Sequence, residues 1–155
     1  MNKSSKKQGT PIKTNDQKDI EDMLCRLKRL YEKIPSIECR HCHACSSPIF
    51  WFYPEEINIR RYLKQNDLQY ITWTQEEFKH HKMQCPYLIE KRCSIYPVRP
   101  LVCRLQGIIE ELPCTFFPTP LISQEEVKQI KEEMNQILVD MNSLDKTYGT
   151  RKIFD

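Results

Sequence analysis

Cysteine is the residue type in this sequence whose number and spacing could do chemistry. Eight cysteines occur in 155 residues, and Cys39, Cys42 and Cys45 follow one another at every third position. Four more lie at wide and unequal intervals further along the chain: Cys85, Cys93, Cys103 and Cys114. Clustered thiols can bind metals, form disulfides, exchange electrons as a dithiol, or pack as small apolar side chains. The surroundings of these cysteines must decide among those alternatives.

The expected compartment favours metal binding or catalysis over stable disulfides. No apolar run approaches the roughly 20 residues that a membrane helix needs. Residues 1–13 carry charge without the apolar core of a secretion signal. We therefore expect a cytoplasmic protein with no membrane association. Because disulfides seldom persist in that reducing compartment, its cysteine clusters are more often metal ligands or catalytic groups.

The cysteine spacing fits no common metal motif completely. A zinc ribbon shows two CxxC knuckles, and the first cysteine segment is the only one with that spacing. The same segment is closer to the bacterial ferredoxin run C-x2-C-x2-C-x3-C-P, but Ile49 stands where the fourth cysteine should be. A distant cysteine must therefore complete any cluster.

Cys103 has surroundings that suit a thiolate. The segment "PVRPLVCRLQG" predicts a turn, then a helix with Pro100 as its first residue and Gly107 as its C-terminal stop. Cys103 would then feel the positive end of the helix dipole, and Arg99 and Arg104 flank it in sequence. These features predict a thiol that is easily deprotonated for metal binding.

The two arginines admit a second interpretation. Together with Tyr96, Arg99 and Arg104 could surround a thiolate-ligated centre, orient its ligands and offset its negative charge. Alternatively, the arginines pair with Glu110, Glu111 or another carboxylate and have no chemical role. The sequence leaves both interpretations open.

The blocks "CRHCHAC" and "CPYLIEKRCSIYPVRPLVCR" resemble those of the CxxCxxCC cysteine-cluster family of zinc- or iron-chelating proteins. The resemblance covers roughly residues 36 to 106, and the second block is too specific to match the family by chance. The family's first block usually ends in two adjacent cysteines, whereas Ser46 takes the second position here. Carried over position by position, the resemblance implies these metal ligands: Cys39, Cys42, Cys45, Cys85, Cys93 and Cys103. Cys114 could make up the ligand count, although the resemblance places no ligand there.

The resemblance implies an iron–sulfur or zinc centre rather than a particular reaction. Six or seven thiols with little competing histidine favour an iron–sulfur cluster, which we expect to be 4Fe-4S, with zinc as the alternative. His41 and His43 fall on spacer positions. The block arrangement is also distantly similar to that of flagellin lysine N-methylase, which suggests that such a module can sit inside a methyl-transferring enzyme. More thiols are present than one cluster needs, so some could serve a second metal site, act as resolving thiols or pack.

The elements around the cysteines are predicted to be mainly helical. A helix begins at Thr14, and its apolar stripe leaves Cys25 on the charged side, as a residue without a role. A second long helix follows a capping box of Ser123 and Glu126, and shorter helices begin at Pro54 and Thr74. The aromatic run at residues 49–53 is the best candidate for a short strand. Its side chains would exclude water from the site. Residues of the first apolar stripe are Ile20, Met23, Leu24, Leu27, Leu30, Tyr31 and Ile34.

We predict a mainly α fold: a small helical domain with irregular cysteine-bearing loops and at most a short strand pair, organised around a metal centre. Residues 1–13 would be a disordered basic tail, 14–142 one metal-cluster domain with its cysteine core at about 36–114, and 143–155 a C-terminal tail. The three glycines are too dispersed for a phosphate-binding loop. The net charge of +3, with lysines interspersed among glutamates, disfavours nucleic-acid binding.

Three functional hypotheses follow from different classes. The first is an iron–sulfur protein that passes electrons or a cluster to a partner enzyme, as a redox or accessory protein. The second is a zinc-stabilised interaction module, whose metal contributes folding energy and whose function lies on its surface. The third is a cluster-dependent enzyme such as a methyltransferase. No motif in the sequence identifies a catalytic residue, so the sequence leaves open whether the protein is an enzyme.

Overall fold

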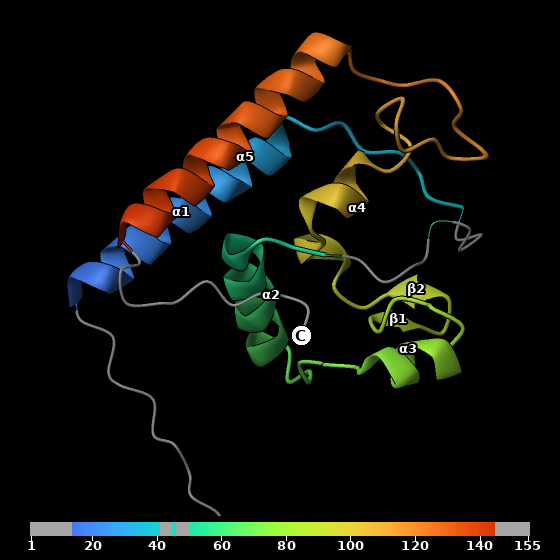
Figure 1. Ribbon diagram of the computed structural model, residues 1–155, viewed down its shortest axis with the longest axis horizontal. Helices are drawn as coiled ribbons and strands as arrows, with labels where there is room; N and C mark the ends of the chain where they lie inside the picture. Colours follow the sequence, from blue (N-terminus) through green and yellow to red (C-terminus); the bar gives the residue numbers. More distant parts are fainter. Residues whose placement is uncertain (1–13, 41–44, 46–49, 145–155) are drawn as a thin grey trace, which may run out of the picture.

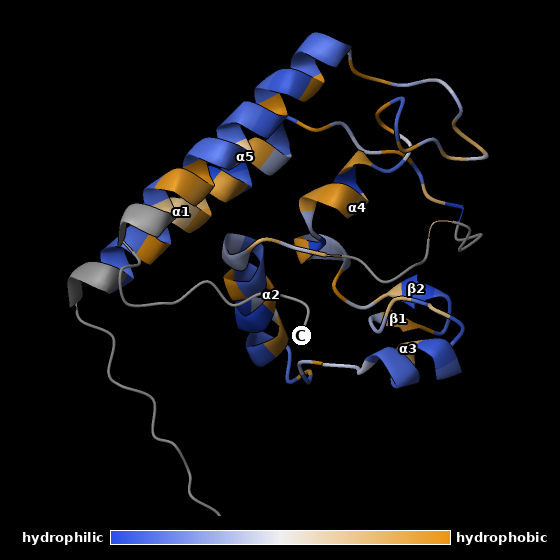
Figure 2. Ribbon diagram, viewed as in Figure 1, coloured by the Kyte–Doolittle hydropathy of each residue, from blue (hydrophilic) through white to orange (hydrophobic). Residues whose placement is uncertain are grey.

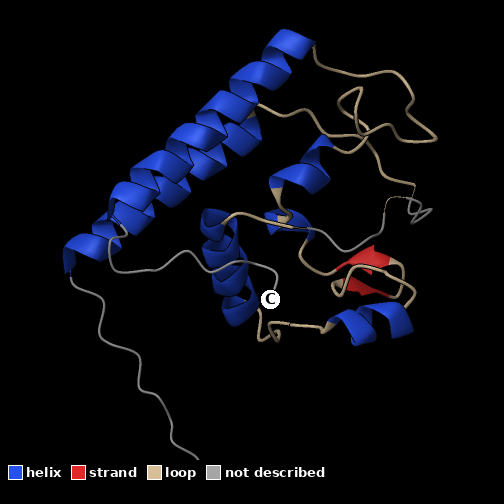
Figure 3. Cartoon of the chain, viewed as in Figure 1, coloured by secondary structure: helices blue, strands red, loops and turns tan. Residues whose placement is uncertain are grey.

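The computed structural model describes residues 14–40, 45 and 50–144. Four α-helices precede a long fifth one, and a short strand pair and a 3-10 turn lie between the third and fourth (Figures 1 and 3). The fold is mainly α with one two-stranded sheet in the described residues, as the sequence predicts. No helix in the described segments is long and apolar enough to cross a bilayer. The elements are α1 (Thr14–Glu32), α2 (Tyr53–Gln65), α3 (Gln75–His80), β1 (Leu88–Ile89), β2 (Arg92–Cys93), η1 (Tyr96–Val98), α4 (Leu101–Leu105) and α5 (Gln124–Leu144).

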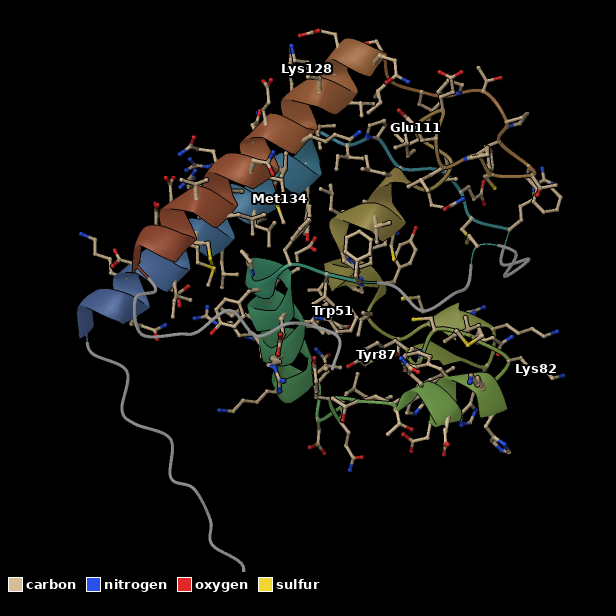
Figure 4. All side chains as sticks on the ribbon, viewed as in Figure 1. Trp51, Lys82, Tyr87, Glu111, Lys128 and Met134 are labelled. Atoms are coloured by element: carbon tan, nitrogen blue, oxygen red, sulfur yellow. The ribbon has the colours of Figure 1, made fainter. Side chains whose placement is uncertain are left out.

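Helices α1 and α5 form a long antiparallel pair along one side of the molecule (Figure 1). The apolar spacing of each helix predicts one buried stripe, and the two stripes face each other in the larger of two cores (Figure 2). Met134 of α5 lies in this core (Figure 4), only 2% exposed. Cys25 is exposed on the other side of α1, as predicted. The pair is therefore a scaffold that carries no described thiol toward the cysteine region.

Two of the helices begin with a capping box, as the sequence predicts. The Ser123 hydroxyl accepts a hydrogen bond from the Glu126 backbone N–H at 3.3 Å, and the Glu126 carboxylate accepts from the Ser123 N–H at 2.8 Å. Thr74 and Glu77 repeat the arrangement at α3, at 3.2 and 2.7 Å. Both boxes satisfy N–H groups that a helix start leaves without intrahelical partners, which is why the sequence signature located these helices correctly.

The strand pair lies at a different place from the one predicted. Residues 50–52 form no strand, and Tyr53 already belongs to α2; residue 49 lies outside the described residues. The strands are instead β1 and β2, with Leu88 opposite Cys93 and Ile89 opposite Arg92. Glu90 and Lys91 connect them with φ angles of 48° and 66°. That left-handed pair of residues matches a tight hairpin turn, for which asparagine and glycine are the usual signal.

A second, smaller core lies beside the hairpin. Its buried members are Trp51, Ile59, Leu63, Tyr87 and Ile95, and Cys85 and Cys93 pack against them. Figure 4 places Trp51 and Tyr87 between α2 and the hairpin, with ring centroids 6.1 Å apart. The smaller core therefore positions two of the candidate metal ligands.

Candidate metal centre

Three candidate ligands approach one another from separate elements. Cys85 precedes the hairpin, Cys93 ends β2 and Cys103 lies in α4. They are close enough that the charge of Cys85 or Cys93 would act on Cys103, and that of Cys93 on Cys85. All three are partly buried. The fold thus brings together residues that lie up to 18 positions apart in the sequence.

Local backbone structure orients two of these sulfurs. Cys85 receives hydrogen bonds from the backbone of Tyr87 and Leu88, and Cys93 receives one from Ile95. These bonds lower the pKa of each thiol, although burial outweighs them and leaves both pKa values raised. Backbone N–H groups directed at sulfur stabilise thiolate ligands once a metal balances their charge.

Tyr87 holds the hairpin around these sulfurs. Its hydroxyl accepts a hydrogen bond from the Ile71 N–H at 3.0 Å. Its carbonyl accepts from the Ser94 N–H at 2.8 Å and from the Ser94 hydroxyl at 3.0 Å. The side chain is 1% exposed. Tyr87 therefore ties the turn that follows Cys85 to the residue that follows Cys93.

Cys103 is not easily deprotonated, which corrects the expectation from its sequence neighbours. Burial raises the pKa of Cys103 to about 12, and the nearby Cys85, Cys93 and Glu55 add to the effect. Arg99 lowers that pKa by less than the sum of these effects. Helix α4 begins one residue later than predicted, with Pro100 as its N-cap. Burial rather than the flanking charge therefore controls the pKa of this thiol.

Arg99 is placed to neutralise a negative centre. Its guanidinium lies over the Tyr96 ring, with its central carbon 3.9 Å from the ring centroid. Its charge lowers the pKa values of Cys93 and Cys103. Its Nε atom is buried and has no hydrogen-bond partner among the described residues. A buried donor beside two thiols suits an anionic thiolate centre, because an unmatched buried N–H is otherwise costly.

Arg104 is directed away from that role. Its guanidinium stacks over the Tyr31 ring at 3.9 Å, and it donates hydrogen bonds to the carbonyls of Arg99 at 3.0 Å and Pro97 at 2.8 Å. Within the described segments, neither arginine pairs with Glu110 or Glu111, the alternative that the sequence left open. Arg104 instead joins α4 to α1 and to the turn before α4.

The first cysteine block follows α1 and is described only in part. Cys39 and Cys45 are exposed, whereas Cys42, with His41 and His43, lies outside the described residues. The Arg40 guanidinium lies 5.3 Å from the centroid of the Phe116 ring. The segment after α1 therefore runs beside the loop that carries Cys114.

Cys114 lies close to Gly107 and to the segment that follows α1. A Cβ placed on Gly107, whose φ is +76°, would be 2.7 Å from Ile37 Cδ1 and 2.9 Å from Cys114 Cβ. Gly107 thus allows the chain after α4 to pass between the two segments, as its predicted role at the helix end requires. Cys114 remains a predicted ligand, now placed beside the chain that leads to Cys39.

The two histidines after Phe78 have a packing role. His80 ends α3, and His81 stacks on the Trp73 ring with centroids 4.2 Å apart.

Glu55 is a residue that sequence reasoning missed. It lies in the first turn of α2, yet it is 1% exposed and accepts three hydrogen bonds. Burial raises its pKa, while the bonds from Tyr31, Phe52 and Leu101 lower it. Its position three residues after Phe52 predicts a helix cap, but no sequence signal indicated its partners in α1 and α4.

The donor set fits a thiophilic metal. Soft thiolates select zinc, copper(I) or iron–sulfur clusters over magnesium or calcium. The described residues do not on their own contain a group of three or more His, Cys, Asp or Glu side chains arranged to hold a metal ion. Cys85, Cys93 and Cys103 lie near one another without forming such a group alone, so the chemistry of the site fits a metal whose ligands come from both blocks.

Comparison with known proteins supports the same chemistry. The family profile described as "CxxCxxCC: Putative zinc- or iron-chelating domain" matches residues 38–133, more than half of the chain. The match includes every cysteine except Cys25. No curated protein and no solved structure matches the chain significantly. The chain therefore belongs to the CxxCxxCC family of zinc- or iron-chelating domains.

Proposed function

We propose that the protein binds an iron–sulfur cluster, of the 4Fe-4S type, and acts as a redox or accessory protein for a partner enzyme. The observation that carries the proposal is the convergence of Cys85, Cys93 and Cys103 beside the buried Nε of Arg99. Two of these thiols have backbone hydrogen bonds to sulfur. Such bonds, burial and a nearby charge are what set the reduction potential of a cluster.

The chain's own residues would perform distinct tasks in this centre. Cys85, Cys93 and Cys103 would bind iron, and one or more cysteines of the first block would complete the ligand set. Arg99 would balance the charge of the thiolates, and Trp51 and Tyr87 would exclude water from one side. When bound, the cluster supplies one-electron chemistry. Tyr96, 42% exposed, would mark the side from which a protein partner approaches.

Zinc is the alternative, because the same arrangement of thiols also suits it. Cys85 precedes a tight hairpin and Cys93 ends its second strand, and both carry backbone hydrogen bonds to sulfur, an arrangement equally suited to one zinc ion. The protein would then be a zinc-stabilised interaction module.

Redox cycling separates the two proposals. The protein is reconstituted anaerobically with iron and sulfide, reduced with dithionite and reoxidised, while its visible absorption and electron paramagnetic resonance are recorded. A redox carrier should bleach on reduction, develop a paramagnetic signal and recover on reoxidation. A colourless protein that binds zinc stoichiometrically and rejects iron would overturn the iron–sulfur proposal in favour of the structural one.

A further inference from the structure

Glu55 connects three helices through one buried carboxylate. Its Oε1 atom accepts hydrogen bonds from the Tyr31 hydroxyl in α1 and from the Leu101 N–H, both at 2.6 Å. Its Oε2 atom accepts from the Phe52 N–H at 2.9 Å. Because all three partners donate, the carboxylate is matched at each contact despite its burial.

The same carboxylate caps two helices. Glu55 is the third residue of α2 and satisfies the N–H of Phe52, the residue that precedes that helix. It also satisfies the N–H of Leu101, the first residue of α4, for which the preceding Pro100 offers no side-chain cap. Helix α4 has only five residues and therefore little intrinsic stability. A cap supplied from α2 compensates for the cap that α4 lacks.

Helix α4 carries Cys103 two residues after Leu101. The bond from Leu101 to Glu55 therefore fixes the segment that presents the third thiol of the converging group. The negative charge of Glu55 opposes a thiolate at Cys103, so its contribution to the centre cannot be electrostatic attraction. Its contribution is therefore geometric, because Glu55 holds α4 against α2. Residues of α2 and the neighbouring Trp51 form part of the smaller core, against which Cys85 and Cys93 pack.

We propose that Glu55 is a positioning residue of the metal centre, which places Cys103 against Cys85 and Cys93 by capping α4 from α2. This inference rests on the proposed metal-binding function and adds a residue outside the cysteine blocks. The alternative is a purely structural role, in which Glu55 stabilises the core without any specific effect on metal binding. The two alternatives differ in whether the effect of Glu55 depends on Cys103.

A double-mutant cycle with cobalt(II) as the probe makes that distinction. Cobalt is titrated into reduced, metal-free protein in competition with a chelator, and thiolate-to-cobalt absorption reports the ligands. The variants are Glu55→Gln in the wild-type, Cys103→Ser and Cys39→Ser backgrounds. The matched control is Glu56→Gln, which removes a neighbouring carboxylate bound to Arg60 within the same helix. Circular dichroism verifies that each variant is folded.

We expect Glu55→Gln to weaken cobalt binding about 10- to 100-fold in the wild-type background, as loss of a ligand-orienting residue does. In the Cys103→Ser background, whose residual cobalt affinity is measured by direct titration without the chelator, it should have no further effect, whereas in the Cys39→Ser background the full effect should persist. Glu56→Gln should bind as the wild type. An equal effect in both cysteine backgrounds, or no effect in the wild type, would overturn the inference while leaving the metal centre intact.

Wild-type protein that binds no cobalt would instead overturn the metal-binding proposal and this inference with it. If Glu55→Gln does not fold, hydrogen exchange of the wild-type protein supplies the decision. The Leu101 amide should be protected both with and without metal, because Glu55 binds it in either state. Exchange of that amide at the rate of an exposed loop amide would refute the cap and hence the inference.

Discussion

At the residue scale, burial and charge act in opposite directions on the candidate thiols. The sequence places arginines beside Cys103 and thereby predicts a low pKa, but the folded chain buries the thiol and raises that pKa to about 12. Sequence neighbours could not reveal this, because desolvation depends on how distant parts of the chain pack around the thiol. The ligand candidates were predictable from spacing and resemblance, whereas their protonation was not.

The first prediction compares two cysteines with opposite surroundings. Cys103→Ser should lose most bound metal, since it removes one of three converging thiols, whereas Cys25→Ser should retain it because Cys25 is exposed on α1 outside the family match. Metal content per chain after reconstitution and desalting measures the difference. Loss of metal from Cys25→Ser with retention by Cys103→Ser would reverse the assignment.

The second prediction concerns the buried bond between Tyr31 and Glu55. Tyr31→Phe should lower the free energy of unfolding by about 1–3 kcal/mol, because it removes a buried donor to a carboxylate that keeps its other two partners. The control is Tyr62→Phe in α2, whose hydroxyl makes no hydrogen bond to another described residue. Urea denaturation of the metal-free proteins gives both values. Equal stability of Tyr31→Phe and wild type would show that the bond is not stabilising.

At the element scale, local signals located the helices and missed the hairpin. Apolar periodicity and the boxes at Thr74 and Ser123 identified helix starts correctly, because both depend on residues within one turn. The hairpin was missed because Glu90 and Lys91 adopt left-handed conformations, for which asparagine and glycine are the usual signal. The aromatic run after residue 49 suggested a strand, but Trp51 instead fills the small core beside α2.

The third prediction tests the chain reversal after α4. Gly107→Ala should destabilise the protein by about 1–3 kcal/mol, because the residue has a positive φ and an added Cβ would clash with Ile37 and Cys114. Thermal and urea unfolding measure the loss. Glu111→Ala, an exposed position in the same connection (Figure 4), serves as the control. Unchanged stability of Gly107→Ala would contradict the close approach of these segments.

At the scale of the whole molecule, two cores of unequal size share the chain. The larger core joins α1, α5 and α4, and the smaller one has five buried residues with two of the candidate ligands packed against it. Cys103 lies between them, on the helix whose buried residues Leu101 and Leu105 belong to the larger core. A metal bound by Cys85, Cys93 and Cys103 would therefore connect the two cores.

The fourth prediction follows from this division. Removing the metal with a chelator under reducing conditions should increase hydrogen exchange in the hairpin and η1, residues 88–98, far more than in α1 and α5. The smaller core has few buried apolar residues to stabilise it without metal, whereas the long helix pair retains the larger core. Mass-spectrometric exchange of the loaded and stripped proteins compares the segments. A uniform change along the chain would contradict a metal that mainly stabilises the smaller core.

The central claim is that the two cysteine blocks together hold an iron–sulfur cluster. Its most direct test is the iron, sulfide and zinc content per chain of anaerobically purified protein. The account predicts about four irons and four sulfides per chain in a brown protein. Stoichiometric zinc without iron would contradict the iron–sulfur assignment, and protein that retains neither metal would contradict the metal centre itself.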